Sequence, residues 1–254
     1  MHGLRARLSG MRAIEVFDDP SALAQAAARH IVAGANAALA ARGRCTIALS
    51  GGTTPHGTFA RLADDLAGAL DWRRVLVYFS DERCVPPDHP ESNYGAANRL
   101  LLDRVPLPSA NIHRIAGERE PMESAAQYEA ALSDIGRFDL ILLGLGLDGH
   151  TASLFPEVVG SSVLDPQNRE RLVLAVHVAS RNSWRITMTP RLINEAREVL
   201  MLAYGMDKAC VVKDVLEGDR RPATLPAQLI EPRDGTLRWL LDRPAASLLG
   251  ASRS

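Results

Sequence analysis

Short apolar runs recur along the whole of this sequence, each followed by a polar loop and in several cases by an amphipathic stretch. Continuous apolar runs of this kind are typical of strands in parallel sheets, which are covered on both faces. Strands separated by helices imply parallel βαβ units. We therefore expect an α/β fold, with a doubly wound, mostly parallel sheet and helices on both faces. The expected strands are residues 13–17, 45–49, 75–79, 138–143, 172–178, 185–188 and 199–203, and the expected helices are residues 21–42, 55–66, 93–102 and 207–217.

The composition is that of an ordinary globular protein, because 46% of the 254 residues are hydrophobic and 23% are charged. No repeat or low-complexity linker divides the chain, so we expect a single α/β domain over residues 11–254. Residues 1–10 precede a second methionine and the first strand-like run, and we expect them to be a disordered extension. The net charge of -1 argues against nucleic acid or an anionic membrane as a partner.

Signals for metal binding, secretion and membrane insertion are missing from the sequence. The three cysteines show no C-x-x-C spacing, and the histidines outside the loops described below lack partners at metal-ligand spacing. No stretch approaches the roughly 20 apolar residues that cross a bilayer. The N-terminus also lacks the apolar core of a signal peptide. We expect a cytoplasmic protein that binds no metal and needs no cofactor.

The loops that follow the expected strands carry the functional information, because ligands of open parallel sheets bind beyond the carboxyl ends of the strands. The first such loop, S-G-G-T-T-P, contains Ser50, Gly51, Gly52 and Thr53. Its glycines let backbone N–H groups turn inward, and a helix N-terminus that favours an anion follows. We expect it to hold a phosphate, although by itself it is equally typical of a plain strand-to-helix turn.

The second loop, S-D-E-R-C-V-P, follows residues 75–79 and brings Asp81 and Arg83 to a strand end, with Asn93 a few residues beyond. Charged groups in this place are costly unless they are solvated, paired or engaged with a ligand. They are therefore candidates for substrate contacts. A surface salt-bridge cluster beside a capped helix explains the same residues equally well.

The third loop, G-L-G-L-D-G-H-T-A-S, follows the most apolar of the expected strands and delivers Asp148 and His150 to the same crevice. Histidine, with an unperturbed pKa of ~6.5, is the side chain best suited to take and return a proton near neutral pH. The alternative is a glycine-rich turn that holds a structural histidine.

Two cations complete the set of candidate residues. Arg185 begins one expected strand, and Lys208 lies in the first turn of the helix after residues 199–203. Either cation is able to neutralise a phosphate. Taken alone, each is more typical of an ordinary surface charge.

Together these loops resemble those of the 6-phosphogluconolactonases of the oxidative pentose phosphate pathway, within a wider group that includes glucosamine-6-phosphate deaminases and isomerases. The deaminases look like M-D-E-Y where this chain has S-D-E-R, and they carry a glutamate at the position of Phe155. The resemblance implies a Rossmann-like fold of the sugar-phosphate isomerase/lactonase type and favours a lactonase. It rests on A-L-S-G-G-T-T-P (48–55), S-D-E-R-C-V-P with S-N-Y (80–94), L-G-L-G-L-D-G-H-T-A-S-L-F-P (143–156), R-I-T-M-T (185–189) and Lys208.

By this resemblance the substrate is 6-phosphoglucono-δ-lactone and the product is 6-phosphogluconate. The resemblance assigns the 6-phosphate to the backbone of residues 50–53 together with Arg185 and Lys208. A lactone is already a reactive ester, so its hydrolysis demands no metal, nucleotide or covalent nucleophile.

The resemblance also implies roles at the other end of the substrate. His150 activates a water for attack on the ester carbonyl and then returns the proton to the departing ring oxygen. Asp148 orients the imidazole or the water, and Arg83 stabilises the carbonyl oxygen or binds sugar hydroxyls. Asp81 and Asn93 are further candidates for substrate contacts.

Two other functions stay open at this point. One is a glucosamine-6-phosphate deaminase or isomerase in which Asp81 moves a proton between neighbouring carbons. The other is a sugar-phosphate sensor without turnover, but 254 residues filled by one sheet leave no room for a DNA-reading module. The expected partner is the small-molecule lactone, and the expected assembly is a monomer or weak homodimer.

Overall fold

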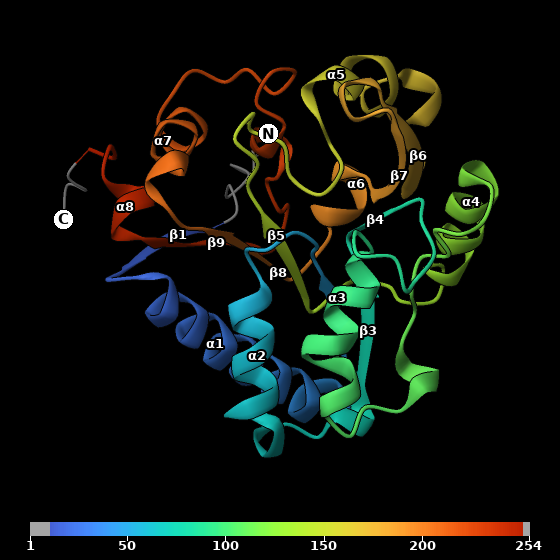
Figure 1. Cartoon of the computed structure of the whole chain (residues 1–254), viewed down its shortest axis with the longest axis vertical. Helices are drawn as coiled ribbons and strands as arrows, with labels where there is room; N and C mark the ends of the chain where they lie inside the picture. Colours follow the sequence, from blue (N-terminus) through green and yellow to red (C-terminus); the bar gives the residue numbers. More distant parts are fainter. Residues whose placement is uncertain (1–10, 251–254) are drawn as a thin grey trace, which may run out of the picture.

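A computed structural model describes residues 11–250, which form two sheets (Figure 1). The larger sheet has six strands in the order β1-β9-β8-β5-β2-β3, and all neighbouring strands in it run parallel. The prediction of an α/β fold with a mostly parallel sheet is confirmed. The strands of this sheet are β1 (Met11–Phe17), β2 (Cys45–Leu49), β3 (Val75–Phe79), β5 (Leu140–Gly144), β8 (Glu198–Ala203) and β9 (Thr236–Asp242).

Helices cover both faces of the larger sheet (Figure 1). α1 (Pro20–Arg42) and α2 (His56–Asp64) pack against each other on one face, and α3 (Asn93–Leu100) packs against α2. α7 (Ala209–Leu216) and α8 (Arg243–Ala246) lie together on the opposite face. The shorter or more peripheral helices are α4 (Pro121–Ala131), α5 (Pro156–Val158) and α6 (Pro190–Ile193).

Local sequence signals set the two ends of α1, the longest helix. The Asp19 side chain accepts a hydrogen bond from the backbone N–H of Ala22 at 2.8 Å, and Pro20 occupies the first helical position. Proline fits there because its missing N–H has no partner within the helix. Gly43 ends the helix in the left-handed region, at φ 77°, which costs glycine little.

The centre of the larger sheet is its most deeply buried part. Ile141, Leu142 and Leu143 of β5 are each 0% exposed, and all five residues of β2 are buried. A strand covered on both faces must be apolar at every position, which explains the uninterrupted run seen in the sequence. This rigid centre fixes the starting points of the loops that follow β2 and β5.

The strand order reverses between β2 and β5. From β2 the chain proceeds to β3 on one side, whereas β5, β8 and β9 follow one another on the other side. In open parallel sheets a crevice forms at such a reversal, because the loops after the two strands turn in opposite directions. The S-G-G-T loop and the loop that contains His150 therefore flank one crevice.

Two expected strands were assigned to the wrong sheet. Residues 172–178 and 185–188 lie in β6 (Val173–Val178) and β7 (Ser183–Met188), which form a separate antiparallel sheet with β4 (Asp81–Arg83). Only residues 179–182 connect β6 to β7, and Asn182 turns the chain at φ 43°. A parallel crossover needs a dozen or more residues, so this connection permits only a hairpin.

The strands β4 and β9 and the helices α4, α5, α6 and α8 were not predicted from the sequence. β9 is an interior strand of the larger sheet, next to the edge strand β1 and paired with β8 on its other side, but its sequence T-L-R-W-L-L-D is interrupted by a charge. α4 packs on β6 and β7, and the hydroxyl of its Tyr128 also hydrogen-bonds with the backbone of Phe79 in β3 of the larger sheet. None of these omissions changes the fold class.

Residues 1–10, the predicted disordered extension, lie outside the described residues, and the division into a single domain stays a prediction. None of the helices described is both long and apolar enough to cross a membrane.

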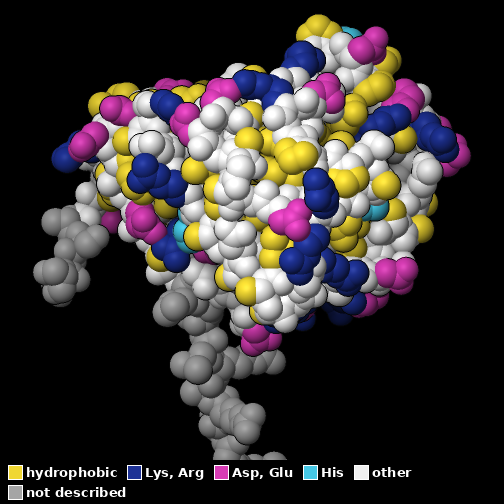
Figure 2. Space-filling view, turned by 90° about the horizontal axis from the view of Figure 1, so that it is seen from below, with side chains coloured by type: hydrophobic (Ala, Val, Ile, Leu, Met, Phe, Trp, Pro, Cys, Tyr) yellow, Lys and Arg dark blue, Asp and Glu magenta, His cyan; other side chains and the backbone are white. Residues whose placement is uncertain are grey.

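Basic, acidic and apolar side chains are interspersed over the face of the molecule in Figure 2. This mixture agrees with the nearly balanced charge of the chain.

Candidate active site

A cleft of about 250 Å³ opens at the strand-order reversal, and we call it the loop cleft. It is lined by residues from the loops after β2 and β5, from β4 and β7, and from the turn before α7. Every residue predicted for the site lines it except Asp148, which contacts it through His150. The predicted residues in its wall are Ser50, Gly51, Gly52, Thr53, Asp81, Arg83, Asn93, His150, Arg185 and Lys208.

The S-G-G-T loop is shaped by close packing. A Cβ atom at Gly51 would lie 1.9 Å from Oδ1 of Asn93, so only glycine fits there. Gly52 adopts φ 75°, in the left-handed region that glycine tolerates. The loop leads into α2, with Pro55 at the N-cap position. Its backbone and hydroxyl donors therefore surround one side of the cleft, as a phosphate site requires.

The acidic pair of the second loop divides into two roles. Asp81 lines the cleft, and its Oδ2 accepts a hydrogen bond from the Ser153 hydroxyl at 2.7 Å. The Nδ2 of Asn93 donates to the backbone carbonyl of Asp81 at 2.9 Å. Glu82 points the other way and is 2% exposed. Part of the cluster is thus structural and part faces the cleft. It is not the surface salt-bridge cluster of the alternative interpretation, because Asp81 and Glu82 are both buried.

Glu82 fastens the start of α3 to β4. Its two carboxylate oxygens accept hydrogen bonds from the backbone N–H groups of Arg83, Asn93 and Tyr94 and from the Ser92 hydroxyl. Burial raises the pKa of Glu82, and the backbone hydrogen bonds oppose that shift. The carboxylate holds the Asn93 side chain in the position where it meets Gly51.

A tight turn presents the histidine. The backbone N–H of Gly146 donates to the carbonyl of His150 at 2.8 Å, and Gly149 adopts φ 78°. A Cβ atom at Gly146 would lie 1.9 Å from Nδ1 of His150, so this glycine makes room for the imidazole. The ring of His150 also stacks on the ring of Phe155, with centroids 4.1 Å apart.

His150 and Asp148 form a hydrogen-bonded pair with Nδ1 of the imidazole 2.5 Å from Oδ1 of the carboxylate. Burial acts to raise the pKa of Asp148, but its hydrogen bonds with His150 and the charge of that residue outweigh burial and hold the pKa at about 2. Asp148 is therefore ionised at neutral pH. A carboxylate at Nδ1 favours the proton on Nδ1, which leaves the lone pair of Nε2 free to accept one.

Four cations line the cleft, and three of them, Arg83, Arg185 and Lys208, were predicted from the sequence. Arg185 is 7% exposed, and its pKa is lowered first by burial and then by the neighbouring charge of Arg83. These two arginines are direct partners in the antiparallel register of β4 and β7. Arg83 also donates a short hydrogen bond to the carbonyl of Glu91. Lys208 donates to the carbonyl of Leu145 at 2.8 Å, which holds its ammonium at the β5 loop.

Several buried polar atoms in the cleft wall lack partners among the residues of the chain that the structure describes. They are the Ser50 hydroxyl, Oδ1 of Asn93 and Nε of Arg185. Buried polar groups are nearly always hydrogen-bonded, since leaving one unpaired costs about 1–3 kcal/mol. Their concentration in one cleft indicates a site that is completed by a polar, anionic ligand or by water.

Sequence reasoning missed some residues of the cleft wall. Ser153 lies in the motif around His150, but its chemistry gave no reason to choose it. Phe155 was considered only as the position of the deaminase glutamate and not as a site residue. Arg181 lies in the β6–β7 hairpin, which was expected to be part of the parallel sheet. The residues of the wall that were not predicted as site residues are Thr54, Gly144, Leu145, Gly146, Ala152, Ser153, Phe155 and Arg181.

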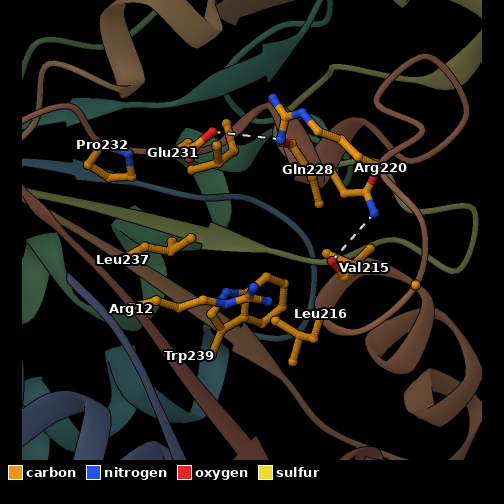
Figure 3. A pocket seen from close by; sticks show the side chains of 12 residues that line it. Arg12, Val215, Leu216, Arg220, Gln228, Glu231, Pro232, Leu237 and Trp239 are labelled. Atoms are coloured by element: carbon orange, nitrogen blue, oxygen red, sulfur yellow. Dashed lines mark hydrogen bonds and ion pairs between the residues drawn. The ribbon is translucent and has the colours of Figure 1, made fainter. Parts of the chain in front are cut away.

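A second cavity, of about 330 Å³, lies between the start of β1, β9 and α7 (Figure 3). Trp239 and Leu237 are on its apolar side, and Arg220 pairs with Glu231 at its polar rim. None of its lining residues belongs to the three loops predicted to carry chemistry, and neither of the two predicted cations lines it. Within residues 11–250 there is also no cluster of three or more side chains suited to a metal ion. The loop cleft is thus the candidate active site.

A family model described as glucosamine-6-phosphate isomerases/6-phosphogluconolactonase matches residues 18–239 of the chain. The chain belongs to this family. The lactonase interpretation and the deaminase interpretation both lie within it, so family membership leaves the choice of reaction to the residues of the site.

Relatives in the family favour one of the two activities. A 6-phosphogluconolactonase of Haemophilus influenzae is 40% identical over 207 residues, which cover 80% of this chain and 87% of the relative. A 6-phosphogluconolactonase of Homo sapiens is 38% identical over 250 residues and covers 93% of both chains.

Solved structures support the same fold. A 6-phosphogluconolactonase from Trypanosoma cruzi superposes with a TM-score of 0.82 at 29% identity, over 97% of this chain and 100% of that one. A monomeric glucosamine-6-phosphate deaminase superposes with a TM-score of 0.79 at 22% identity, over 93% and 99% of the two chains. The likeness to the deaminase shows the fold alone.

Proposed function

We propose that the protein hydrolyses 6-phosphoglucono-δ-lactone to 6-phosphogluconate. One observation carries this proposal: the His150–Asp148 pair opens into the same cleft as the S-G-G-T loop and the unpaired Nε of Arg185. A base at one end and an anion site at the other fit a substrate that has an ester and a phosphate. The activity of the lactonase relatives supports the same reaction.

The phosphate end supplies positioning. The backbone N–H groups of residues 50–53 and the cations Arg185 and Lys208 bind the 6-phosphate, which is held by charge-assisted hydrogen bonds. This contact is remote from the reacting carbon. Because the bound phosphate holds the substrate in place, the water attacks a carbonyl carbon whose position is already fixed.

The histidine end carries out the chemistry. Nε2 of His150 takes a proton from a water whose oxygen attacks the lactone carbonyl carbon, and the ring C–O bond then breaks. The same nitrogen returns the proton to the departing ring oxygen, which becomes the 5-hydroxyl group. The carbonyl carbon becomes a carboxylic acid, which releases its proton to solvent and leaves the carboxylate of the product. Asp148 keeps the imidazole in the reactive tautomer and stabilises the imidazolium that forms transiently.

The wall of the cleft favours lactone hydrolysis over deamination. Phe155 is buried and stacks on His150, where the resemblance to deaminases predicts a glutamate. Both oxygens of Asp81 are also engaged, because Oδ2 accepts from Ser153 and Oδ1 accepts from Ser80 and Asn93. A carboxylate held in this way is a poor candidate for the base that a deaminase needs.

The test is a pair of assays on the purified protein. Acid release from freshly prepared 6-phosphoglucono-δ-lactone, measured above the spontaneous rate, is expected to be rapid. Ammonia release from glucosamine 6-phosphate is expected to be absent. Binding of either compound without turnover would instead favour a sensor.

The reaction's place in sugar metabolism also leads us to propose a cytoplasmic protein. We further propose a monomer or weak homodimer, which sedimentation of the purified protein will test.

A further inference from the structure

Arg181 lies at the rim of the loop cleft in a position with no assigned role. It is the last residue of a single 3-10 turn (Ala179–Arg181) between β6 and β7, and Asn182 reverses the chain directly after it. Its side chain lines the cleft together with His150 and Phe155. The hairpin thus delivers a guanidinium to the cleft from outside the loops of the larger sheet.

Phe155 links this guanidinium to the base. The central carbon of the Arg181 guanidinium lies 5.1 Å from the centroid of the Phe155 ring, within the range of a cation–π contact. The same ring stacks on the imidazole of His150 at 4.1 Å. One aromatic side chain therefore holds both the proton acceptor and a cation at the same end of the cleft.

The charge of Arg181 is not neutralised by an ion pair with any residue in the described range 11–250. Exposed Arg191, for comparison, pairs with Glu170. Glu157 lies close enough to Arg181 to be affected by its charge, but its carboxylate accepts hydrogen bonds from the backbone and hydroxyl of Ser180 instead. The guanidinium is available to an anion in the cleft.

Arg83 is less well placed than Arg181 to contact the end of the substrate that lies beside His150. It stands directly opposite Arg185 in the β4–β7 register, and its Nη1 already donates to the carbonyl of Glu91. The charge of Arg83 lowers the pKa of Arg185 more than the charge of Arg181 does, so Arg83 is the nearer neighbour of a phosphate that Arg185 binds. Arg181 is the arginine of the cleft with a contact to the aromatic neighbour of His150.

We propose that Arg181 is a substrate-contacting residue that binds the carbonyl end of the lactone and the carboxylate of the product. This inference rests on the proposed function. As water adds to the carbonyl carbon, negative charge grows on the carbonyl oxygen, and ring opening leaves a carboxylate at the same carbon. A guanidinium matches a carboxylate through two parallel hydrogen bonds, and its charge stabilises the growing oxyanion before that.

The experiment compares two ligands that differ only at this carbon. 6-Phosphogluconate carries the carboxylate, whereas glucitol 6-phosphate has the same chain with a CH2OH group in its place. Dissociation constants of both are measured by calorimetry for the wild type, Arg181→Gln and Arg181→Lys. Arg191→Gln is the matched control, because Arg191 is also exposed but does not line the cleft.

The proposal predicts that Arg181→Gln weakens 6-phosphogluconate binding about tenfold or more, the range of a hydrogen bond to a charged group. Binding of glucitol 6-phosphate is expected to be unchanged, and Arg181→Lys is expected to recover part of the loss. Equal weakening of both ligands would make Arg181 a general anion contact and overturn the proposal, as would no change in either. Failure of the wild type to hydrolyse the lactone would instead contradict the proposed function, whatever these affinities are.

Discussion

Nδ1 of His150 lies 2.5 Å from Oδ1 of Asp148, two residues earlier in the same glycine-rich turn. The turn holds this geometry locally, since the backbone N–H of His150 also donates to Oδ1 of Asp148 at 3.2 Å. The base and the residue that orients it thus come from one short segment after β5. The parallel pairing of β5 with β2 places them beside the S-G-G-T loop.

Replacement of Asp148 by Asn tests the tautomer argument. An amide at this position no longer holds the proton on Nδ1 of His150. Part of the molecules then carry the proton on Nε2, which has no lone pair left to accept another. We expect the kcat for lactone hydrolysis to fall about 10²-fold or more, with the affinity for 6-phosphogluconate changed much less. A kcat near that of the wild type would show that His150 needs no orienting carboxylate.

The low pKa of Asp148 predicts how stability depends on pH. Its folded pKa of about 2 lies below the unperturbed 3.8, so the carboxylate stabilises the fold above about pH 4, and this contribution is lost as pH falls toward 2. Urea unfolding of the wild type and Asp148→Asn at several pH values measures the effect. The difference in unfolding free energy between the two proteins should shrink as pH falls below about 4. A difference that grows as pH falls from 4 toward 2 would contradict the assignment.

Gly51→Ala tests the phosphate cradle. The added Cβ would overlap the Asn93 side chain at 1.9 Å, so the loop or α3 must move. We expect the KM for the lactone to rise about tenfold or more, because the phosphate contacts supply positioning. Gly34→Ala in α1 is the control, since a Cβ there meets nothing within 4 Å. That variant should keep full activity and gain up to about 1 kcal/mol of stability from helix propensity.

Glu82→Gln tests the anchor of α3. Each carboxylate oxygen of Glu82 accepts two of the four hydrogen bonds, and the substitution replaces one of these oxygens by an amide NH2 that accepts none. Asn93 is therefore expected to shift, and the KM for the lactone is expected to rise. The melting temperature is expected to fall only modestly. The burial that raises the pKa of Glu82 makes its ionised form costly in the folded protein, and a neutral amide avoids that cost. Glu129 similarly binds the backbone of Leu172, away from the cleft, so Glu129→Gln should lower stability without changing KM. Equal effects on KM in both variants would refute a positioning role for Glu82.

The strands that are apolar throughout were the predictable part of the fold. β2, β3 and β5 are buried at nearly every position, and the loop after each of them could be identified from the sequence. The hairpin of β6 and β7 was not recognised, because an apolar run looks the same in a parallel and an antiparallel sheet. The four residues between them were the available signal, since they are too few for a crossover. β9 was not predicted, because Arg238 interrupts its apolar pattern.

In the site, residues with strong local signals were predicted and those defined by tertiary contacts were not. Gly51, Asp148 and His150 belong to glycine-rich loops that follow buried strands, which is a local pattern. Arg181 reaches the cleft only because β6 and β7 fold back as a hairpin and Phe155 holds its guanidinium. Nothing within a few residues of Arg181 encodes that contact.

The most direct test of the account is replacement of His150 by Asn, with lactone hydrolysis and 6-phosphogluconate binding measured on the same preparation. The account predicts that hydrolysis above the spontaneous rate falls about 10²-fold or more while the product still binds, since the phosphate contacts are untouched. Hydrolysis near the wild-type rate, with binding retained, would contradict the role of His150 as the base.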